Sequence, residues 1–223
     1  MPLWYHVKEN KSEDKSMTIS PVALWLNSAF AGFDEAVMML VHRLYELCGV
    51  FFTPFLELIS VLGDGGIFLI ILALFLMLFT RTRRYGLAIL LSIAIGALIT
   101  NLWLKPWIAR PRPYTHEGSI FQQIWQTMGA HTESDKSFPS GHTTAAFSAM
   151  TGLFLVGNKK ISWTAFIFGI LMGISRIYLG VHYPSDVLGG IMVGLIAGSL
   201  GAYISFKLPD AFYNKKLFRK KVG

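Results

Sequence analysis

The chain has 223 residues, of which 53% are hydrophobic and only 15% are charged, and its mean hydropathy is +0.49. Such a small charged fraction is too low to cover a soluble domain of this length, so we expect an integral membrane protein. The formal net charge is +7, but the basic residues fall in three short segments rather than one broad patch. This distribution argues against nucleic acid as a partner.

The N-terminal quarter of the chain differs from the rest in its pattern. The first twenty residues mix acidic and basic side chains without an apolar run, so we expect no cleavable signal peptide. Residues 22–46 have apolar positions interrupted by charged ones, a pattern typical of helices that lie in a membrane interface. We predict two short amphipathic helices there. We expect Thr53-Pro54 to interrupt this pattern, before a further helical stretch that ends near Leu62.

Apolar stretches of near-membrane length follow at residues 65–79, 85–104, 140–156, 161–179 and 187–206. A helix needs about 20 residues to cross a hydrocarbon core of about 30 Å. The sequence therefore predicts an all-α, polytopic membrane helix bundle of five spans, or six if residues 22–46 also cross. In the last stretch, small residues recur every four positions at Gly190, Gly194 and Gly198, which predicts close helix packing.

We divide the chain into an N-terminal segment (1–64), a transmembrane core (65–206) and a basic tail (207–223). With five crossings, the three basic segments all lie on one side, which the positive-inside rule assigns to the cytoplasm. We therefore expect a multi-pass protein of the cytoplasmic membrane with a cytoplasmic C-terminus. The single cysteine, Cys48, excludes an internal disulfide and a multi-cysteine metal site.

Three motifs carry candidate chemistry, and the first runs from Lys105 to Pro113. Cations and tryptophans at a membrane boundary are often interfacial anchors, which is one interpretation of this segment. However, the segment lies on the side where the positive-inside rule expects few cations, and three prolines stiffen it. The pattern favours an anion bound by side chains such as Lys105 and Arg112.

The second motif is Pro139-Ser140-Gly141-His142, at the start of a predicted span. Ser140 is a favourable N-cap, and Gly141 permits close approach to the backbone. The free N–H groups of a first helical turn form an anion site, which would place His142 beside a bound phosphate. The alternative is a capped helix whose histidine merely faces the interface.

The third motif extends from Ser175-Arg176 to His182 and Asp186. An arginine near the end of an apolar helix is costly unless it is paired, so Arg176 is a functional candidate. Asp186, in the first turn of the last helix, can accept a hydrogen bond from Nδ1–H of His182 and so present Nε2. It also suits the helix N-terminus as a negative charge, and both interpretations can hold together. The predicted topology places all three motifs at one membrane face.

Together these residues resemble the type-2 phosphatidic acid phosphatase family, which shares its core with the vanadium haloperoxidases. The family pattern is Lys, six residues, Arg-Pro; then Pro-Ser-Gly-His; then Ser-Arg, five residues, His, three residues, Asp. Every specified position is matched, by Lys105 with Arg112-Pro113, by residues 139–142, and by Ser175-Arg176 with His182 and Asp186. The resemblance covers roughly residues 60–206. Many relatives resemble six-span proteins, whereas the expected first span is weak here.

The resemblance implies a role for each matched residue. The phosphate would be bound by Lys105, Arg112 and Arg176, with help from the Ser140 hydroxyl and the Gly141 N–H. His182 would attack phosphorus to form a phosphohistidine, His142 would protonate the leaving group and later activate water, and Asp186 would orient His182. The two histidines then need opposite protonation states, which predicts a bell-shaped pH profile. No metal or other cofactor is expected, because the cations supply the charge.

A site at the headgroup level implies an amphiphilic substrate, with membrane lipids as its surroundings. Phosphatidic acid, phosphatidylglycerol phosphate and polyprenyl phosphates or pyrophosphates all qualify, and the loop 114–138 contains no motif that selects among them. Two alternatives stay open: a lipid phosphotransferase that uses the same phosphohistidine, and a non-catalytic protein that binds anionic lipids. A haloperoxidase fits less well, because such enzymes are usually soluble. The sequence leaves the oligomeric state open.

Overall fold

A computed structural model of the chain describes residues 19–214, which form helices and loops without a strand. The predicted all-α class is therefore confirmed over this range. The predicted absence of a signal peptide falls almost wholly on residues 1–18, and most of the basic tail falls on residues 215–223. Both lie outside the described residues.

The helices of the bundle match the apolar stretches of the sequence. The longer elements are α1 (Pro21–Ala29), α2 (Ala31–Leu62), α3 (Ile67–Leu78), α4 (Arg83–Ala97), α7 (Gly141–Val156), α9 (Ala165–Tyr178) and α10 (Pro184–Lys207). The shorter elements are η2 (Asp64–Gly66), the π-helical turn η3 (Leu98–Leu104), α5 (Lys105–Ile108), η4 (Pro113–Thr115), α6 (Ile120–Thr127), α8 (Lys159–Ser162) and α11 (Asp210–Asn214). Each of the five predicted stretches corresponds to one main helix, namely α3, α4, α7, α9 or α10; η2 precedes α3, η3 continues α4 and the short α8 precedes α9.

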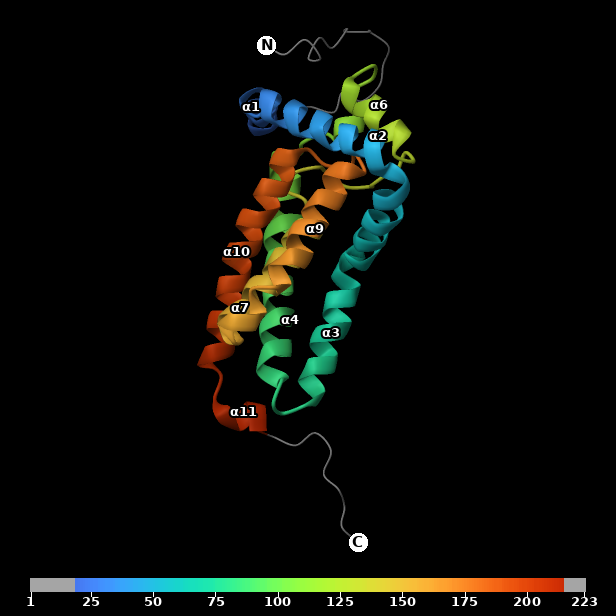
Figure 1. The fold of residues 1–223 in the computed structure, drawn as a ribbon. Helices are drawn as coiled ribbons and strands as arrows, with labels where there is room; N and C mark the ends of the chain where they lie inside the picture. The colour runs from blue at the N-terminus through green and yellow to red at the C-terminus, as the bar shows by residue number, and fades with distance from the viewer. Residues whose placement is uncertain (1–18, 215–223) are drawn as a thin grey trace.

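Helices α4, α7 and α10 form the centre of the bundle and run side by side (Figure 1). The glycines of α10 allow this packing. A Cβ added to Gly194 would lie 2.5 Å from Cβ of Phe147, and one added to Gly198 would lie 2.3 Å from Cβ of Thr151. These separations are far below van der Waals contact, so the predicted role of the glycines in close helix packing is confirmed.

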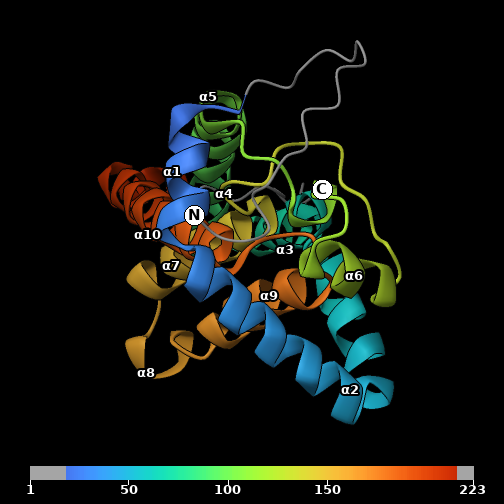
Figure 2. The same ribbon diagram turned by 90° about the horizontal axis from the view of Figure 1, so that it is seen from above.

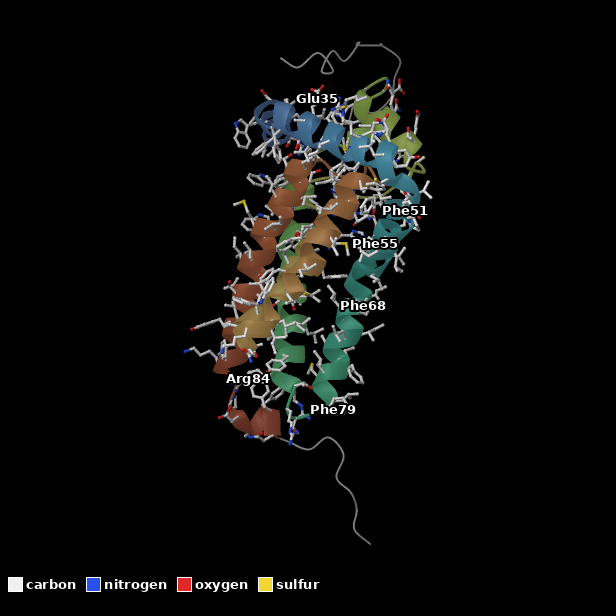
Figure 3. The ribbon with its side chains drawn as sticks, in the orientation of Figure 1. Glu35, Phe51, Phe55, Phe68, Phe79 and Arg84 are labelled. Atoms are coloured by element: carbon white, nitrogen blue, oxygen red, sulfur yellow. The ribbon has the colours of Figure 1, made fainter. Side chains whose placement is uncertain are left out.

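The N-terminal helices cover one end of the bundle. Helix α1 and the first half of α2 lie across that end, and α2 passes over α9 (Figures 1 and 2). The chain then turns and descends along the bundle, through Phe51, Phe55 and Phe68 to Phe79 at the far end (Figure 3).

The predicted interruption of the helical pattern at Thr53-Pro54 is wrong. Helix α2 continues through Pro54 to Leu62. A proline removes one backbone hydrogen bond and bends a helix, but it need not end one. Beyond Pro54, the buried side chains of Leu56 and Ile59 pack against the bundle and stabilise the continuation.

Within residues 19–214, four helical segments are long and apolar enough to cross a membrane: Ala31–Leu62, Arg83–Thr115, Lys159–Tyr178 and Pro184–Lys207. The segment Asp64–Leu78 is apolar but shorter. Large apolar side chains such as Phe51 and Ile71 are exposed on the outside of the bundle, as in a protein surrounded by lipid. The chain is a multi-pass membrane protein. The exact number of crossings, five or six, stays a prediction.

The covered end of the bundle is also its polar end. There, a buried cluster packs α2 and α6 onto the helix ends, and it includes Phe121 and Ile124 of α6, Tyr178 of α9 and Tyr183 just before α10. The same end contains the three sequence motifs, because α5 and α9 end there and α7 and α10 begin there. The fold thus brings together segments that are up to about 80 residues apart in the sequence.

Candidate active site

Lys105 and Arg112 are held on the segment that leaves α4. The π-helical turn η3 precedes Lys105, and α5 ends at Ala109 in the left-handed conformation (φ 51°), which turns the chain toward Arg112. Both cations are buried, and both form ion pairs with the carboxylate of Asp135. Arg112 also donates to the carbonyl of Val181 at 2.8 Å. A carboxylate from the loop therefore joins the two cations.

A cavity of about 250 Å³ lies beside this ion-pair cluster. Four of the five predicted basic and imidazole groups line it: Lys105, Arg112, His142 and His182. Gly141 lines it as well, and a Cβ added there would lie 3.4 Å from Nζ of Lys105. The first turn of α7 and the Lys105 ammonium group thus meet in one space, where an anion would find donors on both sides.

His182 faces this cavity in a defined tautomer. Its Nε2 lies 2.9 Å from Nη1 of Arg112, and since a guanidinium only donates hydrogen bonds, Nε2 is the acceptor. The proton of a neutral imidazole then resides on Nδ1, which lies 3.5 Å from Oδ2 of Asp186. Burial, and next the charge of Arg112, lower the pKa of His182 well below its ordinary value. The ring is therefore neutral near pH 7, with a lone pair on Nε2.

The predicted cap of α7 is present. The Oγ of Ser140 accepts hydrogen bonds from the N–H of Thr143 at 3.4 Å and from its hydroxyl at 2.9 Å. Ser140 itself is buried and does not line the cavity. His142 follows in the first turn, with Nε2 at 3.9 Å from the carboxylate of Asp64. Of this motif, Gly141 and His142 face the cavity, whereas Ser140 supports them from behind.

Arg176 lies in a neighbouring cavity. From the last turn of α9 it forms an ion pair with Glu133 and a hydrogen bond to the hydroxyl of Ser60. It lines a second cavity of about 380 Å³, which shares Asp64, Glu133 and His142 with the first. Four of the five predicted basic and imidazole groups therefore surround one cavity, and the fifth lies beyond the shared wall.

Asp186 is completely buried in the first turn of α10. One oxygen, Oδ1, accepts from Nη1 of Arg110 at 2.6 Å. The other, Oδ2, accepts from the N–H of Tyr183 at 2.9 Å and from the hydroxyl of Ser137. Asp186 therefore caps the helix N-terminus, as one interpretation requires, and its Oδ2 lies 3.5 Å from Nδ1 of His182. The predicted hydrogen bond from Nδ1–H of His182 to Asp186 stays a prediction.

A family model described as PAP2 superfamily matches residues 85–210, which is more than half of the chain. The chain belongs to the PAP2 superfamily. The family resemblance inferred from the three motifs is thereby confirmed, and the matched range contains every predicted site residue of this PAP2 protein.

Individual relatives are similar over most of their length. The PAP2 chain is 38% identical to an undecaprenyl-diphosphatase of Bacillus subtilis over 64% of this chain and 67% of the relative. It is 30% identical to phosphatidylglycerophosphatase B of the same organism, over 97% of this chain and 91% of the relative. The crystal structure of a PAP2 type phosphatidylglycerolphosphate phosphatase from B. subtilis superposes with a TM-score of 0.64 at 28% identity. That superposition covers 84% of this chain and 92% of the other.

Sequence reasoning did not assign several polar residues around the site. Asp135 and Glu133 pair with the predicted cations, Arg110 binds Asp186, and Asp34 binds Arg110. Asp34 did leave a signal, because it breaks an apolar helical pattern. Among residues 19–214, no group of three or more His, Cys, Asp or Glu side chains is arranged to hold a metal ion. The positive charge at the site comes from lysine and arginine.

Proposed function

We propose that this PAP2 protein is an integral membrane lipid phosphatase with a histidine nucleophile. The observation that supports this proposal most directly is the hydrogen bond from Arg112 to Nε2 of His182. It directs the lone pair of a neutral imidazole toward the group best suited to bind a phosphate oxygen. The same cavity contains Lys105 and His142, which supply a second cation and a candidate acid.

Phosphate binding is the first step. The phosphate oxygens would replace the Asp135 carboxylate at Lys105 and Arg112, and the N–H of Gly141 would donate from the first turn of α7. Arg176 would complete the positive surroundings from the adjoining cavity, and Ser140 would hold the first turn of α7 in place as its cap. Each preorganised donor of this kind typically contributes about 10² to 10³ in rate.

Phosphoryl transfer follows in two halves. As the phosphate oxygens accept hydrogen bonds from the N–H groups of Arg112, the lone pair of Nε2 of His182 leaves its hydrogen bond and attacks phosphorus in line. The bond from phosphorus to the leaving oxygen breaks, and His142 gives that oxygen its proton. The imidazolium that forms lies beside the charge of Asp186. His142 then takes a proton from water, the water oxygen attacks phosphorus, and the bond to Nε2 breaks. Inorganic phosphate leaves and both histidines return to their starting states.

The substrate class that we propose is a phosphate monoester or pyrophosphate on an amphiphilic lipid. The two relatives named above act on undecaprenyl diphosphate and on phosphatidylglycerophosphate, as their names state, and both substrates join a phosphate to an apolar anchor. The cavity lies at one end of an apolar helix bundle, where a headgroup would be found. Phosphatidic acid, phosphatidylglycerol phosphate and polyprenyl pyrophosphate are the candidates.

We also propose an orientation in the cytoplasmic membrane. Arg84 lies at the end of the bundle opposite Glu35 and the site (Figure 3). If the basic end faces the cytoplasm, the C-terminus is cytoplasmic and the active site faces the opposite side. Residues 65–206 would then form the catalytic core. Labelling of single introduced cysteines by an impermeant maleimide in intact cells tests this orientation.

Phosphate release from a panel of lipid phosphates tests the activity. Purified wild-type protein in detergent should release phosphate from at least one of the three candidate lipids, equally with and without EDTA, whereas His182→Ala should release none. Transfer to an added acceptor lipid in place of water would identify the phosphotransferase. Binding of the lipids without any turnover would overturn the proposed hydrolysis and favour the non-catalytic binder.

A further inference from the structure

A buried group of charged residues lies behind His182, away from the cavity. It consists of Asp34, Arg110 and Asp186, whose exposed fractions are 1%, 0% and 0%. These residues come from α2, from the loop after α5 and from the start of α10. Neither Asp34 nor Arg110 lines either cavity beside the site. Buried ions are costly unless they are paired, so this arrangement calls for a specific reason.

Arg110 is held at each of its three nitrogens. Nη1 donates to Asp186 at 2.6 Å, Nη2 donates to Asp34 at 3.0 Å, and Nε donates to the side-chain oxygen of Asn27 at 2.8 Å. The guanidinium also lies 3.9 Å from the centre of the Tyr183 ring. Because a planar group with this many contacts has one orientation, the position of Asp186 depends on that of Arg110.

Asp34 is fixed equally well from its other side. The N–H and the hydroxyl of Ser185 both donate to its carboxylate, each at 2.7 Å. Ser185 directly precedes Asp186 in the first turn of α10. Helix α2 therefore contacts the start of α10 twice, once through Arg110 and once through Ser185, so the N-terminal helices are joined to the residue beside His182.

The charges of this group follow from a simple count. Two carboxylates share one guanidinium, so the group has a net charge of −1 while both acids are ionised. When His182 forms its bond to phosphorus, the imidazole becomes positive, and the net negative charge beside it is then balanced. Without Asp34, the single positive charge of Arg110 would be balanced by Asp186 alone. Less negative charge would then remain to stabilise the imidazolium.

We propose that Asp34 and Arg110 are positioning residues for the reaction: Arg110 orients Asp186 beside His182, and Asp34 keeps Asp186 from being neutralised by Arg110. This inference rests on the proposed function. It makes the N-terminal helices part of the catalytic apparatus, although neither residue touches the substrate.

Asp34→Asn tests the inference, because it removes the charge and leaves a carbonyl oxygen that can still accept from Ser185. The matched control is Glu35→Gln, one residue later on the exposed surface at the same end of the bundle (Figure 3). With the lipid on which the wild type is active, Asp34→Asn should lower kcat about 10- to 100-fold, the usual scale for residues that orient a reacting group. KM should stay within about twofold, as expected when an interaction made only in the transition state is lost. The rate of phosphohistidine formation should fall together with kcat. Glu35→Gln should match the wild type in kcat, in KM and in the rate of phosphohistidine formation.

A double-mutant cycle that combines Asp34→Asn with Asp186→Asn separates a positioning role of Asp34 from a purely structural one. If Asp34 acts through Asp186, Asp34→Asn should cause little further loss of kcat in the Asp186→Asn background. Multiplicative losses would overturn the inference. If Asp34→Asn fails to fold in detergent, Arg110→Lys is the second variant. It retains the buried positive charge but lacks the branched guanidinium that contacts both carboxylates, and it should lower kcat at least about tenfold.

The outcomes also separate this inference from the proposed function. A wild type that hydrolyses no lipid phosphate overturns both. An active wild type, an inactive His182→Ala and a folded Asp34→Asn with unchanged kcat overturn only the role of Asp34 and leave the histidine mechanism in place.

Discussion

The two ends of the helix bundle both contain arginines, but they use them in different ways. At the site end, Arg112 and Arg176 pair with the carboxylates of Asp135 and Glu133 beside a cavity. At the opposite end, Arg83 donates to the backbone carbonyls of Met77 and Tyr213, each at 3.0 Å.

The partner determines what each arginine can do. A carboxylate on a loop can be replaced by a phosphate, since both are anions that accept several hydrogen bonds. A backbone carbonyl on a neighbouring segment cannot be exchanged in this way, so Arg83 fastens α11 to the bundle. The comparison teaches that burial and charge alone do not mark a functional arginine. We expect an exchangeable partner and an adjacent cavity to mark the arginines that bind the substrate.

The largest effect is expected at the nucleophile. His182→Ala should abolish phosphate release and phosphoenzyme labelling, because loss of a nucleophile typically lowers the rate by about 10⁶. Rapid alkali-quenched labelling, with a lipid that is radioactive in the transferred phosphate, measures the intermediate, because the P–N bond of phosphohistidine is stable in alkali and breaks in acid. His42→Ala is the matched control, since His42 lies on α2 beside Glu46 and outside the cavity. An active His182→Ala protein would contradict the proposed nucleophile and, with it, the assignment of the active site to this end of the bundle.

Arginine substitutions test the comparison directly. Arg112→Ala and Arg176→Ala should each lower kcat about 10²- to 10³-fold with little loss of folded protein. Arg83→Ala should instead lower the thermal midpoint in detergent, because its buried carbonyl partners lose their donor, and the folded fraction should retain its kcat. Measurements of kcat and of the thermal midpoint for the three variants distinguish the arginines of the site end from Arg83 at the opposite end. Equal turnover in all three would contradict the distinction between the two ends.

The pH dependence tests the state of His182. As the proposed nucleophile, His182 would react as the neutral ring, and burial and the charge of Arg112 lower its pKa. Activity is therefore present above that lowered pKa and is lost as the pH falls through it. The acid limb of kcat/KM, which reports the free enzyme, should lie below the ordinary histidine pKa of about 6.5. Protonation of His142 as the acid should form the opposite limb.

Rates measured between roughly pH 4 and pH 9, with a check of stability at each pH, give this profile. An acid limb at or above the ordinary histidine value would exclude a buried, Arg112-bound nucleophile. A flat profile would contradict the opposite protonation states assigned to the two histidines.

The smallest expected effect concerns the exchangeable carboxylate. Burial alone would raise the pKa of Asp135, but the hydrogen bond and charge of Lys105, with Arg112, hold that pKa below its usual range. Asp135 is therefore ionised, and under the proposed function it would compete with the substrate phosphate for these cations. Asp135→Asn should lower KM about two- to fivefold with kcat nearly unchanged, because the carboxylate is half exposed and its ion pairs are partly screened.

Substrate titrations compare Asp135→Asn with Glu117→Gln, an exposed acid on the same loop segment. A higher KM in Asp135→Asn would mean that this carboxylate supports the cations for substrate instead of competing with it.

The sequence by itself determined the helical stretches, the small-residue face of α10 and the family motifs. These properties are local: apolar length, four-residue spacing and short patterns are written in consecutive residues. The placement of Lys105, Arg112, His142 and His182 around one cavity agrees with the predicted topology, because each motif lies at the end of a span.

Only the tertiary structure decided which charges meet. Asp34 and Asp186 are about 150 residues apart in the sequence, and no local pattern links either acid to Arg110, which directly precedes Pro111. Both acids pair with Arg110 because α2 crosses the end of the bundle and excludes water there. The three ions have no access to solvent and must therefore satisfy one another. The same long-range packing let α2 continue through Pro54.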